Sequence, residues 1–181
     1  MSLRHAILSF LLTMPMTGYD LKTQEFNHSV AHFWPAAQPQ IYRELKSMEE
    51  DQLISRTVVK QVGRPDRHEC HITSAGEGEL RRWLRSYQEP PRHREAFLIQ
   101  LFFSAQLTNE EIATLLEYQL QVHKERLAEL QQLMIPRNVV PAEQRRQILK
   151  GFTLDLGRRM EQTYIDWLTD CIDTVRTVLP A

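Results

Sequence analysis

The sequence predicts a mainly α-helical protein that contains one two-stranded β-hairpin. Apolar side chains recur at helical spacing along most of the 181 residues, and one stretch, residues 53–73, is rich in strand-forming residues around a glycine turn. Two adjacent prolines, Pro90 and Pro91, separate two helical regions. The composition, 42% apolar and 25% charged, is that of a globular chain able to bury a core.

A first helix is predicted over residues 3–13, because apolar side chains recur there at helical spacing and Pro15 interrupts the pattern. Its apolar positions are Ala6, Ile7, Phe10 and Leu11. Thr17 and Asp20 have the spacing of a capping box, so a second helix is expected to begin here and to continue toward Phe26.

A third helix is predicted over residues 39–48, since the fixed φ of Pro39 suits a first helical turn. Gly18 is expected at a tight turn before the second helix, and residues 27–38 are expected to be irregular. The buried stripe of the third helix consists of Ile41, Leu45 and Met48. Its outer side carries Gln40, Tyr42, Arg43, Lys46 and Ser47.

A β-hairpin follows, with strands over residues 53–62 and 68–73 and a basic turn over residues 63–67. Ser74 and Glu77 form a second capping pair, which predicts a fourth helix after the hairpin. Helix, turn, helix and β-hairpin in this order are the layout of a winged helix-turn-helix domain, a DNA-binding fold.

That domain is assigned to residues 1–88, and residues 92–181 are assigned to a C-terminal α-helical dimerisation domain. Helices are expected over residues 97–107, from a cap at Thr108 to Met134, and over residues 141–178. The two long helices should form a hairpin with coiled-coil spacing, and a lone hairpin cannot bury both of its faces. Residues assigned to dimerisation are Leu116, Leu120, His123, Leu127, Leu130, Phe152, Leu156, Leu168 and Ile172.

The third helix is the candidate for reading DNA in the major groove. Gln40 is suited to pair bidentately with adenine, and Arg43 with guanine or a phosphate, whereas Tyr42 and Lys46 suit the DNA backbone. The basic turn of the hairpin would reach the neighbouring minor groove or its phosphates. Residues assigned to DNA binding are Tyr19, Lys22, Gln38, Gln40, Tyr42, Arg43, Lys46, Lys60, Arg64 and Arg67.

Charge gives this interpretation little support, because the net charge is -1 and residues 1–86 hold 11 Lys and Arg against 10 Asp and Glu. Near-neutral charge excludes a protein that coats nucleic acid indiscriminately but allows a specific binder. Three carboxylates, Glu49, Glu50 and Asp51, must point away from the duplex. A protein-interaction module built on a winged-helix scaffold without DNA binding is therefore the alternative.

Other site classes have little support. The pair His28 and His32 and the cluster His68, Cys70 and His71 lack a complete metal-ligand spacing, and strand alternation separates Cys70 from His71. No enzyme motif, metal site or cofactor is expected. No apolar run reaches the roughly 18 residues of a membrane span, so a cytoplasmic protein with no membrane partner is expected.

Aromatic residues offer two interpretations, a site for an unidentified small-molecule effector or ordinary helical core packing. Only two cysteines occur, Cys70 and Cys171, which rules out a disulfide framework. The aromatic residues considered are Phe33, Trp34, Phe97, Phe102, Phe103, Tyr118, Phe152, Tyr164 and Trp167.

Four motifs carry a family resemblance: Gly18-Tyr19-Asp20-Leu21, Phe33-Trp34-Pro35, Gln40-Ile41-Tyr42-Arg43-Glu44-Leu45, and Gly63-Arg64-Pro65 with Ile72-Thr73-x-x-Gly76. On these motifs the chain resembles the PadR family of transcriptional regulators, in the longer form whose C-terminal region is similar to that of the virulence activator AphA.

The resemblance implies a homodimer held by C-terminal helices, two winged domains on a palindrome-like operator, and usually repression of a nearby gene. AphA-like relatives imply that activation is the other outcome. Two residues depart from the family pattern: Gln52 stands where a glycine often precedes the wing strand, and Cys70 stands where a tyrosine is frequent.

Overall fold

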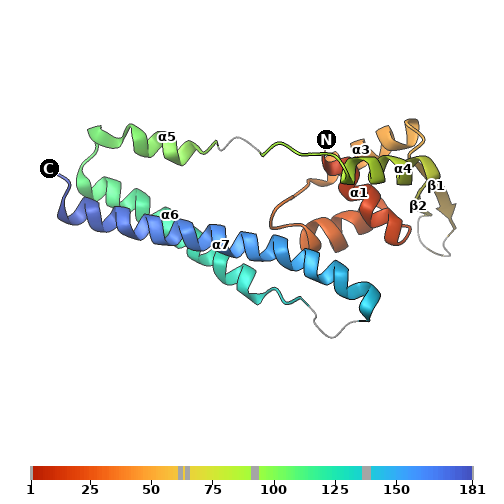
Figure 1. Cartoon of the computed structure of the whole chain (residues 1–181). Helices are drawn as coiled ribbons and strands as arrows, with labels where there is room; N and C mark the ends of the chain where they lie inside the picture. Colours follow the sequence, from red (N-terminus) through yellow and green to blue (C-terminus); the bar gives the residue numbers. More distant parts are fainter. Residues whose placement is uncertain (1, 61–62, 64–65, 91–93, 136–139, 181) are drawn as a thin grey trace. The chain divides into compact units, whose positions relative to one another are not determined.

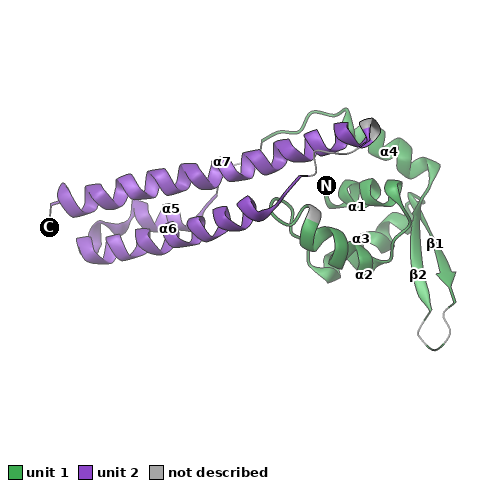
Figure 2. Ribbon diagram, turned by 90° about the horizontal axis from the view of Figure 1, so that it is seen from below, with its two compact units in different colours: residues 1–90 green, residues 91–181 purple. Residues whose placement is uncertain are grey.

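The structure is a computed structural model that describes residues 2–60, 63, 66–90, 94–135 and 140–180. It divides into two compact units, residues 1–90 and 91–181 (Figure 2). As predicted, the described part is mainly helical, with one two-stranded antiparallel sheet and long C-terminal helices. No described helix is both long enough and apolar enough to cross a lipid bilayer.

The first unit contains the predicted order of helices and strands, with one change in the second helix (Figure 1). That helix begins as α-helix and continues as a nine-residue π-helix, three residues beyond Phe26, where the sequence pattern had predicted its end. The elements of the first unit are α1 (Ser2–Thr13), α2 (Gly18–Asp20), η1 (Leu21–Ser29), α3 (Gln38–Glu50), β1 (Ile54–Val59), β2 (Arg67–Ile72) and α4 (Ser74–Leu84).

The core of this unit lies where α1, η1 and α3 converge. Ile41, Leu45 and Met48 are all less than 2% exposed, which confirms the predicted stripe on α3. They pack with side chains of the other elements, namely Ile7, Leu8, Leu11, Met16, Leu21, Phe26, Ile54, Cys70 and Leu80. Burying each of these aliphatic side chains contributes roughly 1.5–3 kcal/mol, so α3 is held firmly by one side.

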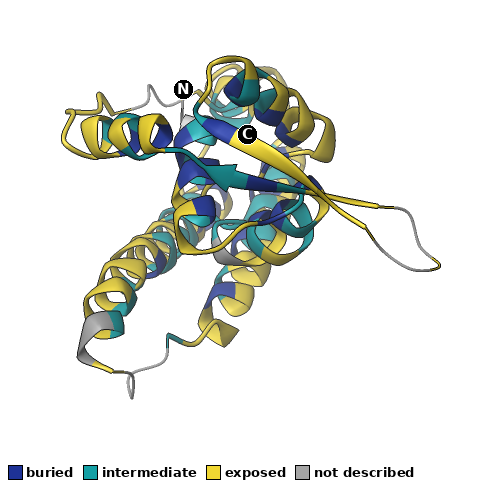
Figure 3. Ribbon diagram, turned by 90° about the vertical axis from the view of Figure 1, so that its right-hand side faces the viewer, coloured by how far each residue is buried: buried dark blue, intermediate teal, exposed yellow. Residues whose placement is uncertain are grey.

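The β-hairpin, called the wing below, pairs β1 with β2 in a register from Ile54 opposite Ile72 to Val59 opposite Arg67. β1 is shorter than the predicted strand, whereas β2 has the predicted length of six residues and begins one residue earlier. Met16 forms an isolated β-bridge with Cys70 of β2. Met16 N–H donates to Cys70 O at 3.2 Å, and Cys70 N–H donates to Met16 O at 2.9 Å. Apart from Ile54, β1 is exposed (Figure 3), so the wing is attached to the domain mainly through β2.

The end of α3 explains the unusual residue Gln52. Gln52 N–H donates to Glu49 O at 3.0 Å and Leu53 N–H to Met48 O at 2.9 Å, which is the Schellman arrangement. Gln52 occupies the position that favours glycine and has a φ of 58°. The departure from the family pattern therefore places a side chain in the left-handed region.

The cap of α4 is Thr73 and not Ser74, so the predicted capping pair was wrong by one residue. Thr73 Oγ1 accepts from Gly76 N–H at 3.1 Å, and Ser74 is already helical. Gly76 is required here, since an added Cβ would lie 2.1 Å from Leu53 O. The turn of α4 thus packs directly on the backbone that enters β1.

The described part of the second unit contains four helical elements, in which α6 and α7 pack side by side as the predicted hairpin (Figure 1). The expected helix over residues 97–107 is shorter and ends in a separate 3-10 turn. The elements are α5 (Ala96–Phe102), η2 (Ser104–Gln106), α6 (Asn109–Gln132) and α7 (Pro141–Thr177). The cap of α6 is confirmed: Thr108 N–H donates to Glu111 Oε2 at 2.8 Å, and Glu111 N–H to Thr108 Oγ1 at 3.3 Å.

Polar contacts fix the hairpin at two levels. His123 is buried, its Nδ1 lies 2.5 Å from Glu161 Oε2, and its ring stacks on Tyr164 with centroids 4.3 Å apart. Tyr164 donates to Glu95 Oε1 at 2.8 Å, and burial together with this bond raises the pKa of Tyr164 to about 12. Further along, Arg158 caps the end of α6 by donating to Leu130 O and Leu133 O, both at 2.8 Å.

The left-handed Gln52 generates a first prediction. Gln52→Gly should raise the free energy of unfolding of the first unit by about 0.5–1 kcal/mol, because glycine adopts this φ without a steric cost. Denaturant unfolding measures the change. Gln52→Ala retains the Cβ and is the matched control, expected to give no gain; equal stabilisation by both substitutions would contradict the strain at this residue.

Candidate nucleic-acid interface

Helix α3 presents two chemically different sides. The apolar stripe faces the core, and the opposite side exposes amide, phenol and cationic groups to solvent. The exposed residues are Gln38, Gln40, Tyr42, Arg43 and Lys46. Hydrogen-bond donors spaced along the outside of one anchored helix are what readout of a major groove requires.

Helix α2 is held close to α3 by the missing side chain of Gly18. A Cβ at Gly18 would lie 2.9 Å from two ring atoms of Tyr42 and 3.1 Å from Leu45 Cδ1. Gly18 is helical, so its role is this close approach and not the tight turn that the sequence suggested. Tyr42 packs on Gly18 yet remains 46% exposed, and Tyr19, the residue after Gly18, is 60% exposed.

Three of the predicted DNA-binding residues on α3 differ in whether their polar groups already form hydrogen bonds or ion pairs within the protein. Arg43 makes no ion pair or hydrogen bond with any described residue. Lys46 lies 3.9 Å from Glu50, and both side chains are largely exposed, so the pair is weak. Gln40 Oε1 already accepts from Ala37 N–H at 3.0 Å, so bidentate pairing with adenine would have to use the second lone pair of this oxygen or replace the bond.

Two predicted DNA-binding residues are engaged within the domain. Lys22 Nζ donates to Ala36 O at 2.7 Å, where it holds the loop before α3. Arg67 Nη2 lies 2.7 Å from Asp20 Oδ2. Of the other wing residues, Lys60 is exposed without a described partner, and Arg64 lies outside the described residues.

The three carboxylates that opposed DNA binding each have a cationic partner. Glu49 pairs with Arg56 at 3.1 Å and Asp51 with Arg4 at 2.8 Å, while Glu50 is the exposed partner of Lys46. Pairing reduces the repulsion of phosphates by Glu49 and Asp51, whereas the weak contact with Lys46 leaves the charge of Glu50 largely uncompensated.

Sequence reasoning missed one contact beside α3. Arg4 bridges α1 to α3 by donating from Nε to Glu44 at 2.8 Å and from Nη2 to Ser47 at 2.9 Å; no local pattern signals a pair 40 residues apart. Trp34, one of the aromatic residues considered for an effector site, is 41% exposed and lines a cavity of about 330 Å³ that includes Gln40 and Arg43.

The cysteine and histidines of β2 do not assemble a reactive site. Cys70 is buried and burial raises the pKa of its thiol, although nearby Arg56 opposes the shift. His71 Nε2 instead lies 2.8 Å from Thr57 Oγ1 across the sheet. Among the described residues, no three His, Cys, Asp or Glu side chains are grouped as metal ligands would be.

The predicted dimerisation residues fall into two groups. Leu116 and Leu168 have no exposed surface, so they pack within the hairpin of one chain and cannot touch a partner in this conformation. The other residues that the chain itself buries are His123, Leu130 and Ile172, with Leu120 and Leu127 partly buried. Phe152 and Leu156, 65% and 59% exposed, are the two that remain largely available to a partner.

These two residues belong to a larger exposed surface, called the apolar stripe of α7 below. It consists of Ile148, Leu149, Phe152, Leu156 and Met160. Ile99 and Phe102 on α5 and Phe103 directly after it are similarly exposed, whereas Phe97 packs on the hairpin. An apolar surface of this extent is typical of a protein–protein contact.

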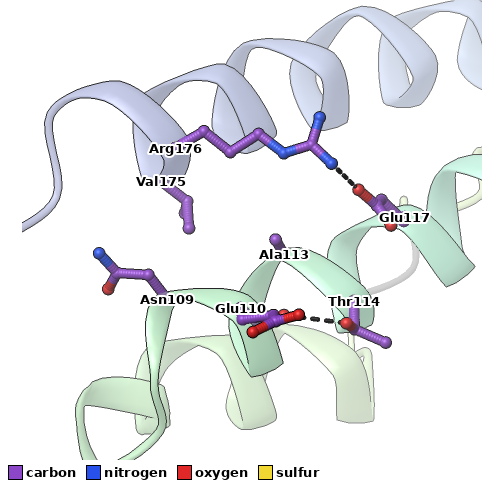
Figure 4. A pocket seen from close by; sticks show the side chains of 7 residues that line it. All are labelled: Asn109, Glu110, Ala113, Thr114, Glu117, Val175 and Arg176. Atoms are coloured by element: carbon purple, nitrogen blue, oxygen red, sulfur yellow. Dashed lines mark hydrogen bonds and ion pairs between the residues drawn. The ribbon is translucent and has the colours of Figure 1, made fainter. Parts of the chain in front are cut away.

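A depression of about 420 Å³ lies where the first turns of α6 meet the last turns of α7 (Figure 4). Polar side chains dominate it, and an ion pair between Arg176 and Glu117 crosses it. None of the aromatic residues considered for an effector site lines this depression.

Two family models match the chain. The model described as "Transcriptional regulator PadR-like family" matches residues 7–82, and the model described as "Virulence activator alpha C-term" matches residues 93–176. The matches follow the two compact units closely.

Two curated proteins are similar in sequence. The negative transcriptional regulator PadR of Bacillus subtilis is 31% identical over 130 residues, which cover 71% of this chain and 71% of that protein. The Mycobacterium tuberculosis protein named "Probable transcriptional regulator Rv1176c" is 40% identical over 92 residues, 51% of this chain. The match spans 48% of the length of the second protein.

Solved structures are similar over almost the whole chain. Bacillus subtilis PadR in complex with operator DNA has a TM-score of 0.83 and 26% identity, covering 97% of this chain and 99% of that one. The same protein with p-coumaric acid has a TM-score of 0.78, 27% identity and coverages of 96% and 98%. The Vibrio cholerae virulence activator AphA has a TM-score of 0.75, 27% identity and coverages of 98% and 99%.

The contact between Gly18 and Tyr42 generates a second prediction. Gly18→Ala should destabilise the first unit by about 1–3 kcal/mol, because the added methyl overlaps Tyr42 and Leu45. Gly78→Ala is the matched control in α4, where an added Cβ meets nothing within 4 Å and helix propensity predicts a gain of roughly 0.5–1 kcal/mol. Unfolding of Gly18→Ala at wild-type denaturant concentration or above would refute the close approach.

Proposed function

The chain belongs to the PadR-like family of transcriptional regulators, and we propose that it binds a palindrome-like operator as a homodimer and represses transcription. The observation that carries the proposal is the exposed side of α3, where Arg43 has no partner in the described protein and Tyr42 and Lys46 flank it. The operator complex of Bacillus subtilis PadR supports the same role for this fold.

In the proposed complex each residue has a distinct task. Arg43 pairs with a guanine edge or a phosphate, and Gln38, Tyr19 and Tyr42 contact the backbone beside it. Lys46 exchanges its weak contact with Glu50 for a phosphate, which costs little because both side chains are largely exposed. Lys60 and Arg64 of the wing supply the remaining contacts outside the major groove.

Dimerisation is assigned to the apolar stripe of α7 together with the exposed residues of α5, in place of the seam that the hairpin itself buries. A second copy of the chain is the occupant proposed for this surface, because palindromic sites are read by two-fold symmetric proteins. Half-sites are then expected about one helical turn, ~34–36 Å, apart or a multiple of it.

The sign of regulation and the effector follow from relatives. The Bacillus subtilis relative is named a negative regulator, and AphA is named an activator, so repression is proposed and activation is the competing outcome. A small-molecule effector is proposed because the same relative was crystallised with p-coumaric acid. We further propose that the protein acts in the cytoplasm and catalyses no reaction.

Selection of bound sequences from a random duplex pool tests the function itself. Enrichment of one palindrome-like sequence, with affinity that falls steeply as salt rises, is the expected result. No enrichment and no salt-dependent binding in dilute buffer would leave the winged domain as a protein-interaction module.

Substitution of single cationic residues on α3 separates sequence-specific base contacts from nonspecific electrostatic attraction to the phosphates. Arg43→Ala should weaken binding to the selected operator by about 1–3 kcal/mol, while Lys46→Ala should weaken all sequences alike and flatten the salt slope by about one unit. Fluorescence anisotropy with operator and random duplexes at several salt concentrations measures both. Unchanged operator affinity of the Arg43→Ala protein would remove Arg43 from the interface.

Charged substitutions test the dimer surface. Phe152→Asp combined with Leu156→Asp should convert a dimer to a monomer of 21.3 kDa, because each carboxylate would be desolvated in an apolar contact. Light scattering after size exclusion gives the mass. Thr153→Asp, at an exposed residue of the same helix turn, is the control expected to stay dimeric; a dimeric double variant would place the interface elsewhere.

A further inference from the structure

We propose that Arg67 is a positioning residue, which fixes the angle of the wing against the helix-turn-helix through Asp20, and that it is not a DNA ligand. The proposal rests on the proposed function for its effect on DNA binding, but the contact itself is testable in the free protein. It reassigns one of the cations that the sequence had placed at the duplex.

The contact joins two elements that are far apart in the chain. Arg67 begins β2, and Asp20 ends the first turn of the second helix, 47 residues earlier. Arg67 Nη2 donates to Asp20 Oδ2 at 2.7 Å, with the two side chains 42% and 17% exposed. The guanidinium lies 4.0 Å from Glu69, so Asp20 is its nearer carboxylate.

Asp20 is a preorganised acceptor. Its Oδ2 also accepts from Thr17 Oγ1 at 2.7 Å and from Thr17 N–H at 3.1 Å, and Gln24 donates to Oδ1 at 3.3 Å. Burial acts to raise the pKa of Asp20, but the bonds from Thr17 and Arg67 outweigh it and the pKa is lowered. The carboxylate therefore stays ionised and fixed in place while DNA is bound at neutral pH.

The position of Arg67 along the strand gives the contact its leverage. The wing is tied to the domain at one level by the backbone bridge between Met16 and Cys70 and by Arg56, which faces Cys70 across the sheet and pairs with Glu49. Arg67 stands three residues further out on β2, about 10 Å at strand spacing. Contacts at a single position along the strand would let the wing pivot about that position. The second contact, from Arg67 further along β2, fixes the angle between the wing and the rest of the domain.

The same contact removes a charge problem. Tyr19 is a proposed DNA contact, and its neighbour Asp20 would repel phosphates if it were bare. Arg67 neutralises that carboxylate, which is why a cation this close to the predicted interface serves without touching DNA. A phosphate could recruit Arg67 only by leaving Asp20 unpaired.

The experiment is a double-mutant cycle read in two ways. Asp20→Asn keeps an acceptor for the Thr17 cap but loses the charge, and Arg67→Gln removes the donor. Each substitution should weaken operator binding by about three- to tenfold and leave the salt slope unchanged. The double variant should bind the operator no more weakly than either single variant. Arg67→Lys should recover part of the lost affinity. Arg81→Gln, which breaks the 2.8 Å pair with Glu77 on α4, is the control of equal charge.

Hydrogen exchange of the DNA-free protein is the second reading. Amides of residues 57–59 and 67–69 should exchange faster in both Asp20→Asn and Arg67→Gln, with residues 41–48 unchanged and the Arg81→Gln protein like wild type. This result stands even if the wild-type protein binds no DNA, which would defeat the proposed function alone. Unchanged exchange, or an Asp20→Asn protein that binds DNA as tightly as wild type while Arg67→Gln lowers the salt slope, overturns the proposal.

Discussion

The structure of the first unit depends on the burial of one side of α3. Ile41, Leu45 and Met48 are almost fully removed from solvent, and this anchoring decides which side of the helix remains polar. A helix held in this way cannot rotate without exposing all three side chains, at a cost of several kcal/mol. The direction in which Arg43 and Lys46 project is therefore a consequence of core packing.

The second unit follows a related constraint. Its two long helices bury Leu116 and Leu168 between them and still leave a row of large apolar side chains exposed on α7. Paired helices of this kind can satisfy only one side of each helix, and the remaining apolar surface calls for a further partner. Packing in the first unit thus orients the helix proposed to contact DNA, while the exposed apolar surface of the second unit supports the proposed pairing of two chains.

Much of the fold could be predicted from local patterns, and most of the side-chain interactions could not. The stripe on α3 and the capping boxes of α2 and α6 are set by residues within one or two turns of each other, so spacing alone reveals them. Arg4 with Glu44 and Arg67 with Asp20 are 40 and 47 residues apart, and no local rule pairs them. Helical spacing also cannot tell an internal seam from an external one: Leu116 and Leu168, predicted at a dimer contact, are buried within the hairpin of one chain.

The central claim is that the solvent side of α3 contacts the duplex. Chemical modification of arginines by phenylglyoxal, measured by mass spectrometry with and without the selected operator, tests it at single residues. The account predicts that operator protects Arg43 while Arg81 on α4 stays reactive. Equal modification of Arg43 in the free protein and in a saturated complex would contradict it.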